Sequence, residues 1–315
     1  MARNDKTAGS GEPVPMDNEA LVRKVREKYA EIAAEAPASG CCGPAQDSSE
    51  RGTLRSPAPE SSCCAPAQDS SESGTLRGPA ETTSEQLGYS AEDLAALPEG
   101  ADLGLGCGAP LRHLDLKPGE TMLDLGSGAG VDVFIAARRV GPEGRAIGVD
   151  MTPEMLTRAR NNAKNASIDN VEFREGRLEA LPVDDGTIDA VTSNCVINLV
   201  PDKSKVFGEV ARVLRPGGRL VISDIVLDGE LPDAVKNDLL SYVGCVSGAV
   251  RREEYFAAVE AAGLSVEAIL DDKDVVTLGF EISPGQVESF AGRAGVAVDD
   301  LRGKVRSVTF RAVKR

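Results

Sequence analysis

The sequence contains no tryptophan, a single histidine, 4 tyrosines and 7 phenylalanines. This shortage of rings leaves little material for the stacking platforms that bind single-stranded nucleic acids, or for aromatic cages around cations. Basic residues are also outnumbered, because 35 Lys and Arg face 50 Asp and Glu and give a net charge of −15. An acidic chain repels phosphate groups, so we expect neither nucleic acid nor a membrane surface as a partner.

Long apolar runs are missing as well. None approaches the roughly 18 residues that a membrane span needs, and residues 1–10 lack the apolar stretch of a signal peptide. We therefore expect a cytoplasmic location. The 315 residues suffice for one large domain or two smaller ones.

Cysteine, by contrast, occurs at seven positions, which are Cys41, Cys42, Cys63, Cys64, Cys107, Cys195 and Cys245. An odd number of cysteines in a cytoplasmic chain does not fit a simple disulfide framework. The remaining explanations are metal binding, redox chemistry, catalysis and plain burial.

The first 88 residues divide into a tail with a helix (1–36) and a linker (37–88). Apolar residues at helical spacing predict an amphipathic helix from Asp17 to Ala36. The linker is rich in Ser, Pro, Gly and Ala, which cannot repay the entropy of ordering, so we expect it to be flexible. It contains a duplication of period 22, in which the 19 residues from Cys41 match those from Cys63 at 15 positions.

Residues 89–263 alternate between strand and helix patterns. The expected strands are 121–126, 145–150, 171–175, 188–194 and 219–224, and the expected helices are 131–140, 153–165 and 202–214. Pro216-Gly217-Gly218 reads as a turn before the last of these strands. Strands that are apolar on both faces and alternate with helices predict a doubly wound α/β domain with a parallel sheet.

The C-terminal part has weaker patterns. Residues 231–246 look helical, and a further helix from Arg252 to Ala262 is ended by Gly263. Strand-like runs at 264–270, 275–280 and 305–310 predict a small α/β region over 264–315.

The run Asp124-Leu125-Gly126-Ser127-Gly128 ends the first strand and opens a helix, as in ligand-binding turns of open α/β sheets. Asp150 closes the second strand, where a carboxylate can accept both hydrogen bonds of a ribose diol. A dinucleotide site would have a third glycine where Val131 stands. The carboxylate of Asp124 would also repel a pyrophosphate, whereas it suits a sulfonium and an amino group. We therefore favour S-adenosylmethionine as the ligand.

Three cysteines stand in loops at the expected ligand edge of the sheet: Cys107, Cys195 and Cys245. Burial as small hydrophobic side chains is the ordinary explanation for each of them. Taken together, they suggest that three thiolates hold a soft atom or ion that prefers sulfur ligands. Zinc would need a fourth ligand, and His113 has no obvious partner. Trivalent arsenic takes three sulfurs and keeps a lone pair that can attack a methyl sulfonium, so it matches better.

Several motifs together resemble the microbial arsenite S-adenosylmethionine methyltransferases, within the class I superfamily. They are Gly-Leu-Gly-Cys-Gly (104–108), Ser-Asn-Cys-Val-Ile-Asn-Leu (193–199), Gly-Cys-Val-Ser-Gly-Ala (244–249), the glycine turn, Arg-Pro-Gly-Gly (215–218) and Val-Arg-Glu-Lys-Tyr (25–29). The resemblance covers about residues 17–263 without the repeat. It implies a Rossmann-like fold, with Cys195 and Cys245 holding arsenic and Cys107 as the third thiolate.

The resemblance also implies a set of cofactor contacts: Gly126, Gly128, Asp150, Met151, Leu178, Glu179 and Asn194. With Asp124 and Ser127 of the glycine turn, the predicted cofactor residues number nine. Arg177, beside Leu178, departs from the family pattern, in which an acidic or small residue is commoner. The family further has a more N-terminal cysteine in a redox relay, for which Cys41, Cys42, Cys63 and Cys64 are the candidates. Thioredoxin or a small thiol would be the reductant, and arsenite would arrive as a thiol conjugate.

Two other functions fit the sequence. A methyltransferase acting on carbon or oxygen of a small metabolite shares the cofactor motifs, but does not need Cys195 or Cys245. A non-enzymatic, thiol-rich metalloid-binding protein would bind arsenite without consuming S-adenosylmethionine.

Overall fold

The computed structural model describes residues 17–35, 84–232, 235, 248–282, 287–288, 291–292 and 295–315. The strands are β1 (Thr121–Leu125), β2 (Arg145–Asp150), β3 (Val171–Glu175), β4 (Ile188–Asn194), β5 (Leu214–Leu227), β6 (Leu264–Asp274) and β7 (Val305–Lys314). The α-helices are α1 (Asn18–Glu35), α2 (Ser84–Leu87), α3 (Ala91–Ala95), α4 (Val131–Val140), α5 (Pro153–Asn165), α6 (Lys203–Val213), α9 (Arg252–Ala261) and α10 (Val275–Ile282). Short 3-10 helices are η1 (Pro110–His113), η2 (Ile197–Leu199) and η3 (Val298–Asp300).

These strands form one sheet in the order β3-β2-β1-β4-β5-β7-β6. Strands β1 to β5 pair in parallel, whereas β7 lies antiparallel between β5 and β6. The predicted doubly wound, Rossmann-like α/β fold is confirmed. The two C-terminal strands β6 and β7 extend the same sheet.

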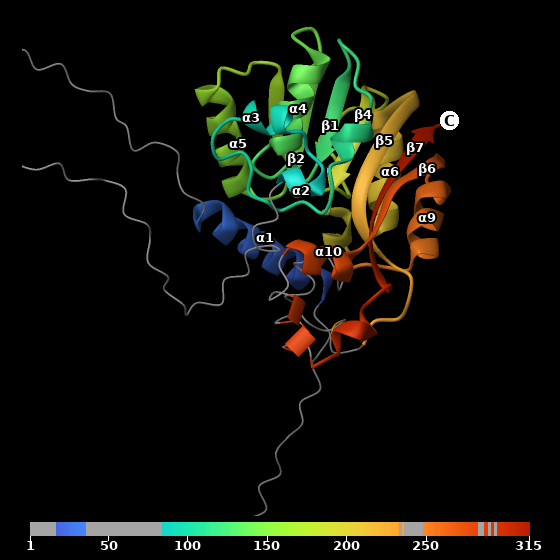
Figure 1. Cartoon of the computed structure of the whole chain (residues 1–315). Coiled ribbons are helices and arrows are strands. Elements are labelled where there is room, and N and C mark those ends of the chain that lie inside the picture. Colours follow the sequence, from blue (N-terminus) through green and yellow to red (C-terminus); the bar gives the residue numbers. More distant parts are fainter. Residues whose placement is uncertain are drawn as a thin grey trace, which may run out of the picture.

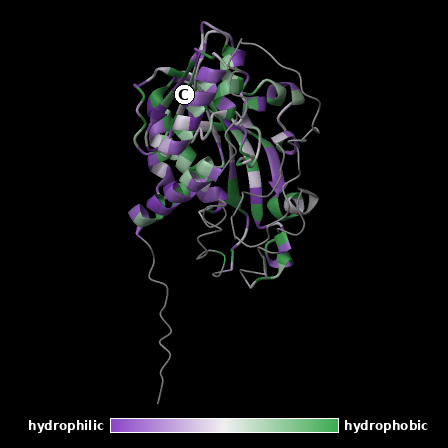
Figure 2. Ribbon diagram, turned by 90° about the vertical axis from the view of Figure 1, so that its left-hand side faces the viewer, coloured by the Kyte–Doolittle hydropathy of each residue, from purple (hydrophilic) through white to green (hydrophobic). Residues whose placement is uncertain are grey.

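Helices cover both faces of the sheet (Figure 1). Side chains of α4 and α5 form one core with Met122 of β1, and side chains of α6 and α9 form another core with Leu123 of the same strand. Consecutive residues of a strand point to opposite faces, so β1 contributes to both layers. Green, hydrophobic segments accordingly run along the strands in Figure 2.

Most predicted elements agree with the structure. The helices at 131–140 and 153–165 and the strands at 145–150, 171–175 and 188–194 have the expected bounds. Ser90 caps α3 by accepting a hydrogen bond from the Asp93 N–H at 3.0 Å. Thr152 stands at the start of α5 without a capping hydrogen bond from its side chain.

Two local expectations were wrong. The Pro-Gly-Gly turn lies inside β5, where Leu214 pairs with Ile188 and Arg219 pairs with Ala190. The intervening residues therefore bulge from the strand edge. The run at 275–280 belongs to helix α10, because an Asp274 carboxylate oxygen accepts the Thr277 N–H at 2.7 Å and starts a helix.

Other predictions lie outside the described residues. They include the helix at 231–246, most of the linker and the repeat with its four cysteines. The proposed domain boundaries stay a prediction. In the described part of the chain, no helix combines the length and the apolar character that crossing a membrane requires.

Candidate functional site

The turn between β1 and α4 forms the floor of the site. Gly126, Gly128 and Gly130 have φ angles of +73°, +51° and +100°, in the left-handed region that favours glycine. The N–H groups of Gly126 and Ser127 both donate to the Val149 carbonyl oxygen, at 2.7 and 3.1 Å. The turn is thereby fixed against β2, with its backbone open to a ligand.

One pocket lies above this turn, and all nine predicted cofactor residues line it. They are Asp124, Gly126, Ser127, Gly128, Asp150, Met151, Leu178, Glu179 and Asn194. Cys195 also lines it, together with Leu105 and Gly106 of the loop that carries Cys107. The pocket therefore joins the predicted cofactor residues to part of the predicted thiol site.

Three carboxyl groups give the pocket its electrostatic character. Asp124 is 3% exposed, and burial raises its pKa well above the usual value, with further increases from the charges of Asp132 and Asp150. Burial likewise raises the pKa of Asp132 to about 6 and raises that of Asp150. Crowded carboxylates in a low-dielectric site are stabilised by a bound cation.

Polar atoms in the pocket are left for a ligand. The buried Ser127 hydroxyl has no hydrogen-bond partner among the described residues. The Asp150 carboxylate oxygens accept the N–H groups of Gly128 (2.9 Å) and Thr152 (2.8 Å). Each carboxylate oxygen has a second lone pair, so Asp150 can still accept hydroxyl groups.

Asn194 connects this pocket to the Cys107 loop. Its Oδ1 accepts the Cys107 N–H at 3.0 Å, and its Nδ2 donates to the Gly108 carbonyl at 2.7 Å and to the Tyr89 hydroxyl at 3.1 Å. The Tyr89 hydroxyl in turn donates to Asp132 at 2.8 Å. One hydrogen-bond network thus spans both parts of the site.

The Cys107 and Cys195 segments meet at one carbonyl group of β5. The Ser223 carbonyl oxygen accepts the Cys195 N–H at 2.8 Å and the Cys107 thiol at 3.6 Å. The Ser307 hydroxyl of β7 donates to the Cys107 carbonyl at 2.9 Å. Both cysteines are unbridged, and Cys195 is buried. The structure therefore brings together two of the three predicted arsenic ligands, while Cys245 lies outside the described residues.

The backbone of Cys195 has a φ of +62°. A residue with a Cβ pays about 1 kcal/mol for this left-handed conformation. Such positions concentrate at functional sites, where the surrounding structure holds them in place.

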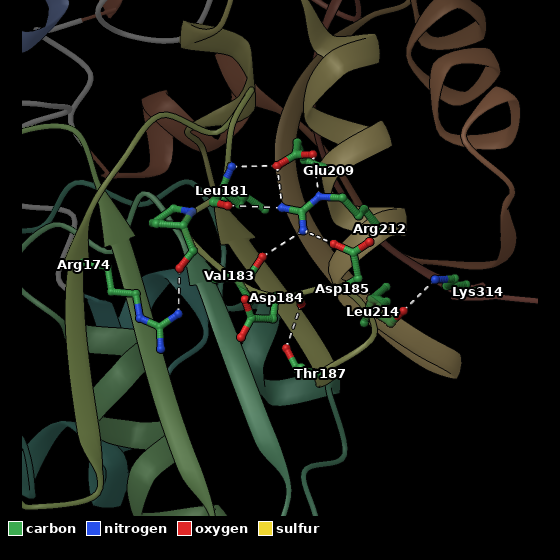
Figure 3. A network of polar contacts seen from close by, with 11 residues as sticks. Arg174, Leu181, Val183, Asp184, Asp185, Thr187, Glu209, Arg212, Leu214 and Lys314 are labelled. Carbon is green, nitrogen blue, oxygen red and sulfur yellow. Dashed lines mark hydrogen bonds and ion pairs between the residues drawn. The ribbon is translucent and has the colours of Figure 1, made fainter.

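The loop after β3 carries Leu178 and Glu179, and a clamp on α6 holds it (Figure 3). The Arg212 guanidinium donates to the carbonyl oxygens of Val183 (2.8 Å) and Leu181 (3.1 Å) and to both carboxylate oxygens of Glu209. Glu209 also accepts the Leu181 N–H at 2.7 Å. The loop is therefore fixed through its backbone.

Helix α1 closes one side of the pocket with Val22, Val25 and Tyr29. Arg177, the departure from the family pattern, lies between Glu19 of α1 (3.0 Å) and Glu179 (2.9 Å). It thus links α1 to the loop after β3.

A second buried network lies beside the thiols, around Asp224 of β5. Its carboxylate accepts hydrogen bonds from Asn198 Nδ2 (2.8 Å), the Ile225 N–H (2.9 Å) and the Tyr255 hydroxyl (3.0 Å). Burial raises the pKa of Asp224 to about 6, although these hydrogen bonds and the charge of Lys203 oppose the increase.

Sequence reasoning missed Tyr89, Asp132, Ser223 and Ser307. Asp132 had a detectable signal, since it is a charged residue within the apolar run 131–137. The other three act through contacts between distant segments, which a sequence pattern does not reveal. No group of three or more His, Cys, Asp or Glu residues in the described ranges is arranged to hold a metal ion.

A family model described as a methyltransferase domain matches residues 116–274. The chain belongs to this family. The matched range contains the glycine turn, Asp150, the loop after β3 and Cys195, so the methyltransferase domain includes most of the pocket described above.

Known proteins are similar to part of this chain. An arsenite methyltransferase of Halobacterium salinarum is 52% identical over 186 residues, covering 59% of this chain and 48% of that protein. An arsenite methyltransferase of Aquipseudomonas alcaligenes is 37% identical over 187 residues, covering 56% and 53%. The chain thus spans about half the length of the curated relatives it matches.

A solved structure also matches. The arsenic(III) S-adenosylmethionine methyltransferase of Chlamydomonas reinhardtii superposes with a TM-score of 0.53 at 29% identity, covering 72% of this chain and 71% of that one. The resemblance inferred from the sequence motifs is confirmed by these similarities.

Proposed function

We propose that the protein transfers the methyl group of S-adenosylmethionine to trivalent arsenic. The observation that carries the proposal is the meeting of the Cys107 and Cys195 segments at the Ser223 carbonyl, beside the acidic pocket. The similarity to arsenite methyltransferases supports the same substrate. Detoxification of arsenic would be the biological result.

The pocket residues fit S-adenosylmethionine. Asp124 and its acidic neighbours match the positive sulfonium and ammonium groups, and the buried Ser127 hydroxyl offers an unused polar atom. Asp150 would hold the ribose hydroxyls, and Leu178 with Glu179 would border the adenine. When bound, the cofactor supplies a methyl group on a positively charged sulfur.

Arsenite would exchange from a thiol conjugate onto Cys107, Cys195 and Cys245. The arsenic lone pair then forms the As–C bond while the S–C bond breaks, and the bonding pair stays on the sulfur. Holding the two reactants together supplies much of the rate. The nucleophile carries no proton, so no general base is required.

Return of arsenic to the trivalent state requires two electrons from thiols, which leaves a disulfide. We infer that Cys41, Cys42, Cys63 or Cys64 joins this relay, with thioredoxin or a small thiol as the external reductant. Deleting residues 43–64 leaves one Cys pair. Unchanged multiple turnover in that variant would indicate that the duplication adds nothing to the relay.

The decisive experiment compares wild type with Cys195→Ser in the presence of arsenite, S-adenosylmethionine and a thiol reductant. We expect methylated arsenic by mass spectrometry in the wild type and at least about a hundredfold less in the variant, because one soft ligand is lost. Retained cofactor binding serves as the control. Full activity of Cys195→Ser would favour a carbon or oxygen acceptor. Arsenite binding by the wild type without cofactor consumption would favour a metalloid-binding protein.

A further inference from the structure

The side chains of the Asp224 network are almost completely buried, and such burial of a carboxylate needs an explanation. Asp224 is 1% exposed, and Asn198 and Tyr255, which donate to it, are both at 0%. A carboxylate removed from water is costly even when it is hydrogen-bonded, and an apolar residue often stabilises a core at least as well. Three donors that hold one carboxylate therefore suggest a use for its charge.

The network lies close to the thiols. Asp224 directly follows Ser223, whose carbonyl oxygen accepts the Cys195 N–H and the Cys107 thiol. The pKa of Tyr255 is raised mainly by burial, then by the charge of Asp224, and further by the charges of Cys107 and Cys195. The Tyr255 hydroxyl donates to Asp224 at 3.0 Å, so Tyr255 lies between the carboxylate and the surroundings of both cysteines.

The charge at the arsenic site changes during the proposed reaction. Arsenic(III) bound by three thiolates is neutral overall. The arsenic lone pair forms the As–C bond, the S–C bond breaks, and its electron pair stays on sulfur, so the arsenic complex gains one positive charge. A fixed carboxylate interacts weakly with the neutral complex and favourably with the charge that develops, which accelerates transfer without tightening substrate binding.

We propose that Asp224, held in place by Asn198 and Tyr255, acts as a positioning residue whose fixed charge favours the positive charge that arrives at arsenic. This inference rests on the proposed function. It gives the Asp224 network a role in the rate of methyl transfer, separate from the binding of arsenite by the thiols.

The test is a single-turnover measurement on the full chain, loaded with arsenite and mixed with S-adenosylmethionine. For Asp224→Asn we expect a rate lower by roughly ten- to a hundredfold, with arsenite affinity in equilibrium dialysis changed less than about threefold. Asp224→Glu keeps the charge and should restore most of the rate. Asp189→Asn removes a carboxylate that is paired with Arg215 and accepts the Thr121 N–H, so it serves as the matched control and should leave the rate unchanged.

Tyr255→Phe provides an independent measurement if Asp224→Asn does not fold. This variant keeps the Asp224 carboxylate but removes the Tyr255 hydroxyl that donates to it. We expect the rate of methyl transfer to fall by roughly three- to tenfold at unchanged arsenite affinity. A rate for Asp224→Asn within twofold of wild type would overturn the inference and leave the proposed function intact. If Asp224→Asn and Asp224→Glu both lost rate and arsenite affinity to the same extent, the role of Asp224 would be merely structural. Failure of the wild type to methylate arsenite would instead refute the proposed function.

Discussion

Single residues of this site carry charges and conformations that are costly in a folded core. Cys195 has a left-handed backbone, and the carboxyl groups of Asp124 and Asp132 are buried within one pocket. Natural proteins keep such features where function needs them. The cost in stability is measurable for Asp132, whose pKa is raised by burial to about 6.

We expect Asp132→Asn to change how stability depends on pH. Because the folded-state pKa lies above the unfolded value of 3.8, the folded protein binds the proton more tightly, and stability falls as pH rises from about 4 to about 6. The asparagine cannot ionise and can still accept the Tyr89 hydroxyl. Relative to wild type it should gain about 2 kcal/mol of unfolding free energy between pH 4.5 and 7.

Urea unfolding at several pH values measures this gain. The slope of the unfolding free energy against urea concentration should stay the same in both proteins, since the surface exposed on unfolding does not change. Parallel stability curves for the variant and the wild type would contradict the assignment of a raised pKa to Asp132.

At the scale of elements, the loop after β3 depends on the clamp formed by Arg212 and Glu209 of α6 (Figure 3). Arg212→Lys keeps the charge but cannot hold two carbonyl groups and a carboxylate together. We expect the KM for S-adenosylmethionine to rise by roughly three- to tenfold with kcat within about twofold, because ordering the loop on binding costs affinity.

Steady-state kinetics at saturating arsenite separate the two constants. Lys314→Ala is the matched control, since its ammonium donates to the Leu214 carbonyl of β5 at 2.7 Å and not to the loop after β3. A fall in kcat at constant KM in Arg212→Lys would show that the clamp acts on the reaction itself.

Most elements could be predicted because their signals are local. Alternating strand and helix patterns with glycine or proline at the ends gave the bounds of α4, α5, β2 and β4 within the chain. The run 275–280 was misjudged because a short apolar segment suits a strand or a helix equally well, and the capping Asp274 decides between them. The bulge in β5 depends on its pairing with β4, which is not a local property.

The pocket residues could be predicted for the same reason, because their signals are local. The nine expected pocket residues follow strand ends or lie near them, where a doubly wound sheet binds ligands. The anchoring of Cys107 was not predictable, because its contacts with Ser223 and Ser307 join residues 116 and 200 positions apart.

The whole molecule carries a net charge of −15, which repels itself in the compact state. Raising NaCl from about 0.05 to 1 M shortens the Debye length from more than 10 Å to about 3 Å. We expect the Tm to rise by about 3–6 °C, equivalent to about 1–2 kcal/mol for a domain of this size. The exposed ion pairs weaken as well, but each contributes little.

Differential scanning calorimetry in NaCl and KCl measures the effect. Equal shifts in the two salts would indicate screening, whereas a shift in only one would indicate binding of a particular ion. A Tm that stays constant or falls with salt would show that the ion pairs outweigh the repulsion.

Strand β7 follows all other described elements along the chain, yet its Ser307 holds the loop of Cys107, 200 positions earlier. During translation the pocket side of the sheet can therefore form well before this cysteine has its final support. A nascent chain would acquire the pocket above the glycine turn first, and the Ser307 contact that holds the Cys107 loop only after residues 305–314 have left the ribosome. Under the proposed function, the order of synthesis would therefore postpone completion of the thiol site until the end of translation.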